Sequence, residues 1–193
     1  MSIQFMLLMS ALLVLLQSAP AFAEEGEWRG IQSFGIRGLY GQSDRDNITF
    51  NSLLPRVSLF LPPVIDQPLA DWHCQAEFVI EPIFSYIKNH PDAVEAGINP
   101  IFFSLRYDVG QRLVPFFEGG EGVLYTDLSG ENLGGDFQFS SQAGGGVHWF
   151  LDRTTALTVS YRIRHISNAG ISQQNSGLNT NSVTFGLSFF PKR

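Results

Sequence analysis

Residues 157–167 read LTVSYRIRHIS, a stretch in which apolar and polar side chains alternate. Successive side chains of a β-strand point to opposite faces, so this period of two predicts a strand with one apolar and one polar face. The apolar face holds four residues and then continues into a histidine and a serine: Leu157, Val159, Tyr161, Ile163, His165 and Ser167. The strand therefore carries two polar side chains on the side where apolar ones are expected.

The same period of two recurs in eight runs along the chain. They are residues 31–41, 53–61, 73–83, 98–107, 113–126, 137–150, 156–167 and 182–190. Longer connections at 42–51, 85–96, 127–136 and 168–181 alternate with shorter ones, apart from one longer link at 62–72. A soluble sandwich would show the same alternation of side chains, but long external loops and short periplasmic turns are typical of outer-membrane barrels. The sequence predicts an all-β protein, an eight-stranded antiparallel transmembrane β-barrel.

Charged residues fall on the polar faces of these runs and would point into the barrel. They are Arg37, Arg56, Glu77, Glu81, Arg106, Glu118, Arg162 and Arg164. An interior of this size is filled by side chains, so the mixed charges predict a plug and disfavour transport. Aromatic residues near the strand ends suit the two interfacial girdles: Tyr40, Trp72, Tyr107, Tyr125, Trp149 and Phe190.

Residues 1–23 have no charged side chain, are apolar from 5 to 16 and end in Ala21-Phe22-Ala23. This pattern predicts a signal peptide that is cleaved near Ala23 and leaves residues 24–193 as the barrel domain.

The net charge of -6 argues against nucleic acid as a partner, because phosphate binding needs clustered cations. The single cysteine, Cys74, allows no internal disulfide.

Motifs that hold cofactors or metal ions are absent from the sequence, so we expect neither a cofactor nor a metal site. The chain contains no C-x-x-C pair, no H-E-x-x-H helix and no phosphate-binding loop. Asp44, Asp46 and Asn47 offer oxygen ligands in one loop, but a hard cation needs more of them. We interpret these three residues as part of a solvated loop.

His165 and Ser167 are two residues apart on one strand, so they share a face at a separation of roughly 6.5 to 7 Å. Polar groups on a lipid-facing surface cost free energy unless they have partners. An ester-cleaving pair that acts on a membrane lipid would explain them. The alternative is a simple strand end, at which an interfacial histidine precedes the polar residues of a loop.

Residues 165–171 read HISNAGI, and Asn175-Ser176-Gly177 and a closing amphipathic strand follow them. This segment resembles the signature of the lipid A 3-O-deacylase (acyloxyacyl hydrolase) family of outer-membrane β-barrels. PFFEGGEG at 115–122 is similar to the fifth strand of that family.

The resemblance implies a carboxylic ester hydrolase of the Gram-negative outer membrane, with lipid A as its substrate and without a cofactor. It implies that Ser167 is the nucleophile and His165 the general base. Asn175 and the backbone N–H of Gly170 match the oxyanion hole. Asn168 belongs to the same signature, and we expect it to shape the turn.

The third member of the triad departs from the family pattern. The position of the family's acidic residue falls on Asn179, and the chain has no Asp or Glu after Asp152. Asn179 can accept a hydrogen bond from histidine but supplies no charge. An acid from another loop, such as Asp127, Glu131 or Asp136, is one alternative. The other alternative is a catalytically silent structural or adhesion-type barrel.

The sequence also leaves open which acyl chain is removed and whether two subunits form a homodimer.

Overall fold

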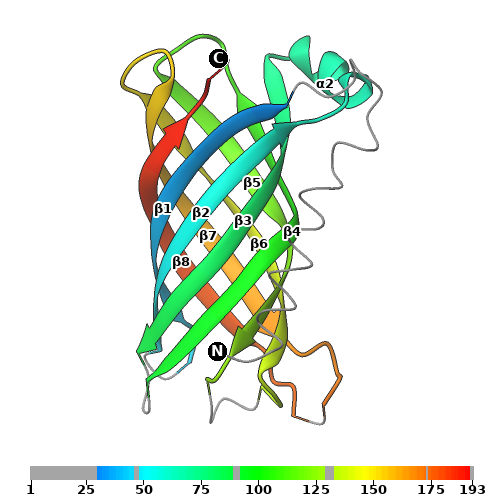
Figure 1. Cartoon of the computed structure of the whole chain (residues 1–193), viewed down its shortest axis with the longest axis vertical. Coiled ribbons are helices and arrows are strands. Elements are labelled where there is room, and N and C mark those ends of the chain that lie inside the picture. The colour runs from blue at the N-terminus through cyan, green and yellow to red at the C-terminus, as the bar shows by residue number, and fades with distance from the viewer. Residues whose placement is uncertain (1–29, 46–47, 89–91, 129–132, 173, 192–193) are drawn as a thin grey trace.

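The computed structural model describes residues 30–45, 48–88, 92–128, 133–172 and 174–191. The predicted signal peptide at 1–23 and three residues named above, Asp46, Asn47 and Glu131, lie outside these ranges. The described residues form eight strands: β1 (Ile31–Ser43), β2 (Thr49–Phe60), β3 (Cys74–Lys88), β4 (Ala93–Tyr107), β5 (Leu113–Thr126), β6 (Phe137–Phe150), β7 (Thr155–Ser167) and β8 (Leu178–Phe189). Each strand pairs antiparallel with its neighbours, and β1 pairs with β8 (Figure 1). The predicted eight-stranded barrel is confirmed.

The two ends of the barrel differ in their connections. The longer link between β2 and β3 contains helix α2 (Pro63–Ala70), which lies at the same end as the C-terminus, at the top of Figure 1. The connection from β7 to β8 lies at the opposite end. No helix in the described ranges is long and apolar enough to cross a membrane.

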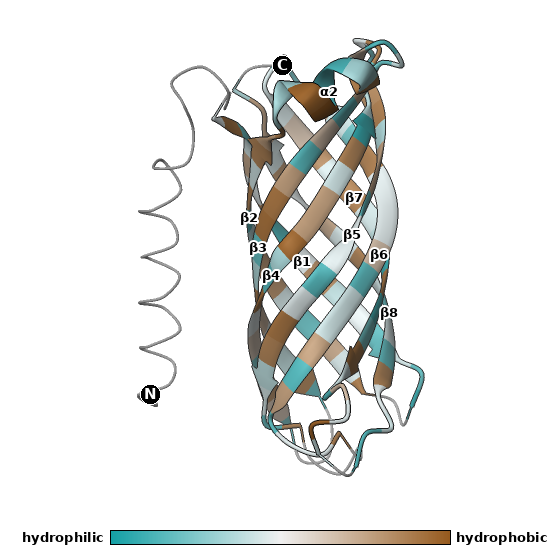
Figure 2. Cartoon of the chain, turned by 90° about the vertical axis from the view of Figure 1, so that its right-hand side faces the viewer, coloured by the Kyte–Doolittle hydropathy of each residue, from teal (hydrophilic) through white to brown (hydrophobic). Residues whose placement is uncertain are grey.

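Alternation along the strands separates an apolar outside from a polar inside. Hydrophobic and hydrophilic residues follow one another along the strands in Figure 2. Large apolar side chains point outward and stay exposed, among them Phe117, Ile163 and Phe185. All eight charged residues predicted to point inward are buried, so the predicted plug is confirmed. Closure of the barrel pairs the backbone of every strand on both sides, which an apolar bilayer requires.

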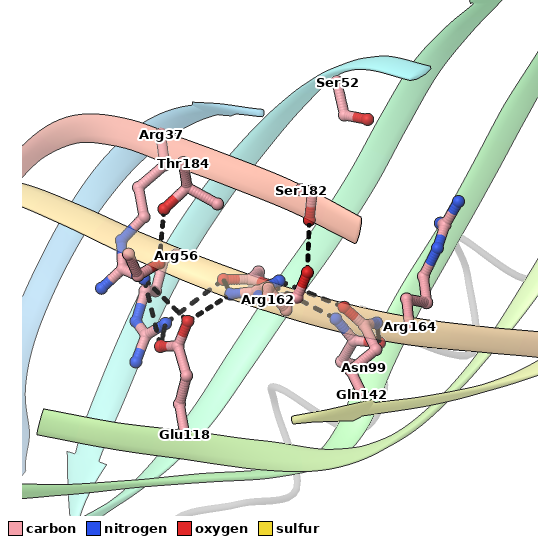
Figure 3. A network of polar contacts seen from close by, with 12 residues as sticks. Arg37, Ser52, Arg56, Asn99, Glu118, Gln142, Arg162, Arg164, Ser182 and Thr184 are labelled. Atoms are coloured by element: carbon pink, nitrogen blue, oxygen red, sulfur yellow. Dashed lines mark hydrogen bonds and ion pairs between the residues drawn. The ribbon is translucent and has the colours of Figure 1, made fainter. Parts of the chain in front are cut away.

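Two glutamates and three arginines make the centre of the plug. Glu118 on β5 accepts hydrogen bonds from Arg37 at 3.1 Å, from Arg56 at 2.7 Å and from Arg162 at 2.7 Å. Glu81 on β3 binds Arg162 at 2.6 Å and Arg56 at 3.3 Å. Glu118, Arg56 and Arg162 lie together inside the barrel in Figure 3. The interior charges therefore connect strands that are not neighbours in the sheet.

Several strands extend further toward the end away from α2 than the sequence predicts. β2 begins at Thr49 instead of 53, β3 ends at Lys88 instead of 83, and β4 begins at Ala93 instead of 98. β8 begins at Leu178 instead of 182. Backbone pairing between strands holds these residues in the sheet, and their side chains continue to alternate between the inside and the outside. The extension of β8 brings Asn179 into the ladder opposite His165.

The prediction that Phe190 belongs to an interfacial girdle is wrong. Phe190 is 1% exposed, and its ring centroid lies 5.2 Å from that of Phe150 and 5.1 Å from that of His148. The alternation of β8 puts Phe189 on the outside, where it stacks on Phe34, and turns the next residue inward. The other five predicted girdle residues are exposed.

Glu118→Gln should destabilise the barrel by about 3 kcal/mol or more, because it removes the carboxylate that binds Arg37 and leaves Arg56 and Arg162 with Glu81 as their central carboxylate. The measurement is the urea midpoint of the refolded protein in detergent micelles. Glu121→Gln on the same strand is the matched control, because Glu121 is exposed. Equal midpoints for the two variants would show that the central charges do not stabilise the fold.

Candidate active site

His165 and Ser167 lie on the outer face of β7, at the end of the barrel away from α2. Arg164 and Ile166 beside them are buried, whereas His165 is exposed and Ser167 is half-buried. In the part of the chain that the structure describes, the Ser167 hydroxyl forms no hydrogen bond, so it can turn toward the imidazole. The strand thus brings the two predicted residues to one surface that faces the membrane.

Two residues hold the ring of His165. Its Nδ1 lies 2.7 Å from Oδ1 of Asn179, the residue directly opposite on β8. Gly177 lies against the other side of the ring, because a Cβ added there would be 2.5 Å from Cε1 and 3.0 Å from Nε2. Gly177 also has φ +61°, a conformation that favours glycine. The orientation of the imidazole is therefore fixed by a hydrogen bond and by close packing.

Asn179 connects the histidine to an acid, Asp44, which directly follows β1. Asn179 Nδ2 donates to Asp44 Oδ2 at 2.7 Å, and its backbone N–H donates to Oδ1 at 3.2 Å. The hydrogen bond from the Asn179 side chain is the largest cause that lowers the pKa of the Asp44 carboxyl below its ordinary value. Asp44 is therefore ionised at neutral pH. Sequence reasoning placed Asp44 in a solvated loop and missed this contact.

Asn168 organises the connection between β7 and β8. It is 2% exposed, and its Nδ2 donates to the carbonyl oxygens of Leu133 at 2.7 Å and Gln174 at 2.9 Å. Its Oδ1 accepts the backbone N–H of Gly170 at 2.8 Å. These contacts fit the turn-shaping role that we expect for Asn168.

The two predicted oxyanion-hole donors differ in their present bonding. The N–H of Gly170 is engaged by Asn168, as described above. The Oδ1 of Asn175 accepts the backbone N–H of Asn168 at 3.0 Å, which turns the amide nitrogen of Asn175 away from that bond. Within the described ranges, Asn175 Nδ2 has no hydrogen-bond partner. Of the two, Asn175 is therefore the one whose N–H groups no described residue occupies.

Two of the three loop acids considered as alternatives to Asn179 are bound elsewhere, and the third, Glu131, lies outside the described residues. Asp127 Oδ1 accepts the backbone N–H of Val94 at 2.7 Å, and Asp136 Oδ2 accepts the hydroxyl of Tyr125 at 2.8 Å. Among the described residues no group of three or more His, Cys, Asp or Glu side chains could hold a metal ion. Of the acids that the structure describes, Asp44 is the one that hydrogen bonds connect to the histidine, through Asn179.

Comparison with known proteins identifies the family. The sequence model of the family described as "Lipid A 3-O-deacylase (PagL)" matches residues 49–188. The lipid A deacylase PagL of Pseudomonas aeruginosa PAO1 is 32% identical over 81 residues, which are 40% of this chain and 44% of the relative. This match therefore spans less than half the length of that relative.

Solved structures share the fold. The match to the outer membrane enzyme PagL has a TM-score of 0.62 at 19% identity, and it covers 79% of this chain and 97% of that enzyme's chain. Neisserial surface protein A has a TM-score of 0.52 at 12% identity, with 83% and 96% covered. The N-terminal β-barrel domain of Pseudomonas aeruginosa OprF has a TM-score of 0.50 at 11% identity, with 83% and 100% covered.

The family match covers well over half of the chain and includes β2 through to Ser188 in β8, with both His165 and Ser167. The closed barrel with its apolar outer surface agrees with the solved outer-membrane structures. This chain belongs to the lipid A 3-O-deacylase (PagL) family, and its place is the outer membrane of a Gram-negative bacterium.

Proposed function

We propose that this chain is a serine esterase that hydrolyses an ester-linked acyl chain of lipid A, at the 3-O position. The observation that carries the proposal is the hydrogen bond between His165 and Asn179 on the outer face of β7, beside Ser167. A lipid can reach this face from the membrane without entering the barrel. The family match supports lipid A as the substrate.

The hydrogen bond to Asn179 selects the form of His165 that can act as a base. An amide oxygen only accepts hydrogen bonds, so the ring donates its proton from Nδ1 and keeps the lone pair on Nε2. The lone pair takes the proton of Ser167 as Oγ attacks the ester carbonyl carbon. The imidazolium then gives this proton to the departing sugar oxygen.

The attack turns the ester carbonyl oxygen into an oxyanion, which Asn175 and Gly170 would stabilise. Asn175 offers its amide N–H groups, and Gly170 would share its N–H between the oxyanion and Asn168. Removal of one such donor typically lowers kcat by about 10²- to 10³-fold. Water, activated by His165, then cleaves the acyl-serine ester and releases the fatty acid.

Ser167→Ala and His165→Asn should each lower deacylation by several orders of magnitude, because each removes a reacting group. Both residues lie at a strand end, so the barrel should still fold. The unheated variants should then migrate differently from the heated ones in a denaturing gel, as the wild type does. The measurement is mass spectrometry of lipid A after incubation with the purified variants in detergent. Ser176→Ala, at an exposed serine of the same connection, is the matched control.

A wild-type rate in Ser167→Ala would overturn the assignment of the nucleophile. If the wild type itself leaves lipid A intact, the competing class, a silent structural or adhesion-type barrel, becomes the better description. The neutral Asn179 at the family's acidic position is the observation that favours this second class.

Gly177→Ala should lower kcat about a hundredfold, because the new methyl group would push the His165 ring away from Asn179. Gly110→Ala is the matched control, since Gly110 also has a positive φ, +76°, and open space around it. The measurement is the initial rate on purified lipid A. Equal rates for the two alanine variants would show that the ring does not need its present position.

A further inference from the structure

We infer that Asp44 is a positioning residue of this site, which fixes the orientation of the Asn179 carboxamide and thereby the proton on His165. The inference rests on the proposed function and extends it to a residue outside the family signature. Asp44 binds neither the reacting atoms nor the histidine. It acts through one intervening side chain.

The carboxamide of Asn179 can point in two ways. An amide has an oxygen that accepts hydrogen bonds and an NH₂ group that donates them, and its two orientations are nearly equal in shape. An ionised carboxylate only accepts, so the NH₂ group of Asn179 must face Asp44. The 2.7 Å contact from Nδ2 to Oδ2 has this polarity. Asp44 therefore selects one of the two orientations.

The orientation of the Asn179 carboxamide decides which nitrogen of His165 carries the proton. With the NH₂ group held by Asp44, Oδ1 of Asn179 faces Nδ1 of the ring at 2.7 Å. The ring then carries its proton on Nδ1 and leaves Nε2 free to act as a base. In the opposite orientation the NH₂ group would donate to Nδ1, and the proton would lie on Nε2. That tautomer cannot accept the proton of Ser167.

Backbone hydrogen bonds hold Asp44 in place. The last pair of the β1–β8 ladder is Ser43 with Thr180, and the backbone N–H of Asp44 continues it by donating to Asn179 O at 3.0 Å. Ser43 N donates to Ile48 O at 2.9 Å and closes the turn that follows. The carboxylate also accepts the backbone N–H of Asn179. Asp44 is therefore held by the pairing of β1 with β8, which closes the barrel.

The contribution of Asp44 differs from that of an acid in direct contact with histidine. Its negative charge is exposed and separated from the ring by a side chain, so water weakens its attraction for the imidazolium. Replacement of a directly bound acid by an amide costs about 10⁴-fold in kcat. We therefore expect a smaller effect here, mainly through the population of the active tautomer.

Asp44→Asn should lower kcat about tenfold at unchanged KM. The surface that binds the substrate stays intact, while in a fraction of the molecules His165 has the inactive tautomer. Asp127→Asn and Asp136→Asn are matched controls, since both remove an exposed acid from the same end of the barrel without a bond to Asn179. Gel mobility of the unheated protein checks that each variant folds.

The ¹⁵N spectrum of histidine-labelled protein gives a readout that a purely structural role would not change. The chain has four histidines, and the His165→Asn variant identifies the signals of His165. The wild type should show a protonated Nδ1 and an unprotonated Nε2. In Asp44→Asn the two signals should move toward each other, as expected for a mixture of tautomers.

A substitution at Asn179 distinguishes an orienting role of Asp44 from a role in holding the loop that follows β1. Asn179→Asp puts a carboxylate, which can only accept, against His165 and makes the orienting contact unnecessary. Combined with Asp44→Asn, it exchanges donor and acceptor, so that the amide at position 44 donates to the carboxylate at position 179. In this double variant kcat should return to the wild-type value or exceed it. Asn179→Asp alone places two carboxylates against each other, so one of them must hold a proton and the gain should be smaller.

The inference is wrong if Asp44→Asn keeps the wild-type kcat and ¹⁵N pattern. It is also wrong if kcat falls but neither the ¹⁵N signals move nor the exchanged pair recovers. Both results would leave the proposed function intact as long as Ser167→Ala abolishes the activity of the wild type. A wild type without activity, indistinguishable from Ser167→Ala, would instead contradict the proposed function.

Discussion

The pairing of buried charges around Arg162 is the interaction on which the rest of the barrel depends. Its guanidinium binds Glu81 from β3 and Glu118 from β5, while its backbone belongs to β7. The surrounding lipid offers no partner for a charge, so these groups must find each other inside. A shift of β7 by one residue would break these contacts and would turn His165 to the inside. The interior thus fixes the register that keeps His165 and Ser167 on the outer face.

The candidate site follows from pairing between strands that are far apart in the sequence. His165 and Asn179 meet because β7 and β8 form a hairpin, and Asp44 joins them because β8 also pairs with β1. His165, Ser167, Asn179 and Asp44 lie on or next to strands, while the proposed oxyanion donors lie in a connection held by Asn168. Such support is what a reaction needs when its groups must keep their positions in a membrane. Closure of the barrel therefore also completes the site.

The sequence predicted the features that depend on local periodicity and missed those that depend on distant pairing. The alternation of two placed His165 and Ser167 on the outer face and the eight plug charges inside, because side-chain direction repeats every second residue. The contact of Asp44 with Asn179 joins positions 135 residues apart, and nothing near Asp44 in the sequence signals it. The early start of β8 was missed for the same reason, since polar residues join a strand when both neighbours pair with them.

The central claim is that the outward site cleaves a lipid A ester between the acyl carbon and the sugar oxygen. The most direct measurement is the mass spectrum of both products when purified wild-type protein acts on lipid A in H₂¹⁸O. The account predicts that lipid A loses one acyl chain and that the released fatty acid gains one ¹⁸O, while the freed sugar hydroxyl stays unlabelled. Intact lipid A, or ¹⁸O on the sugar, would contradict it.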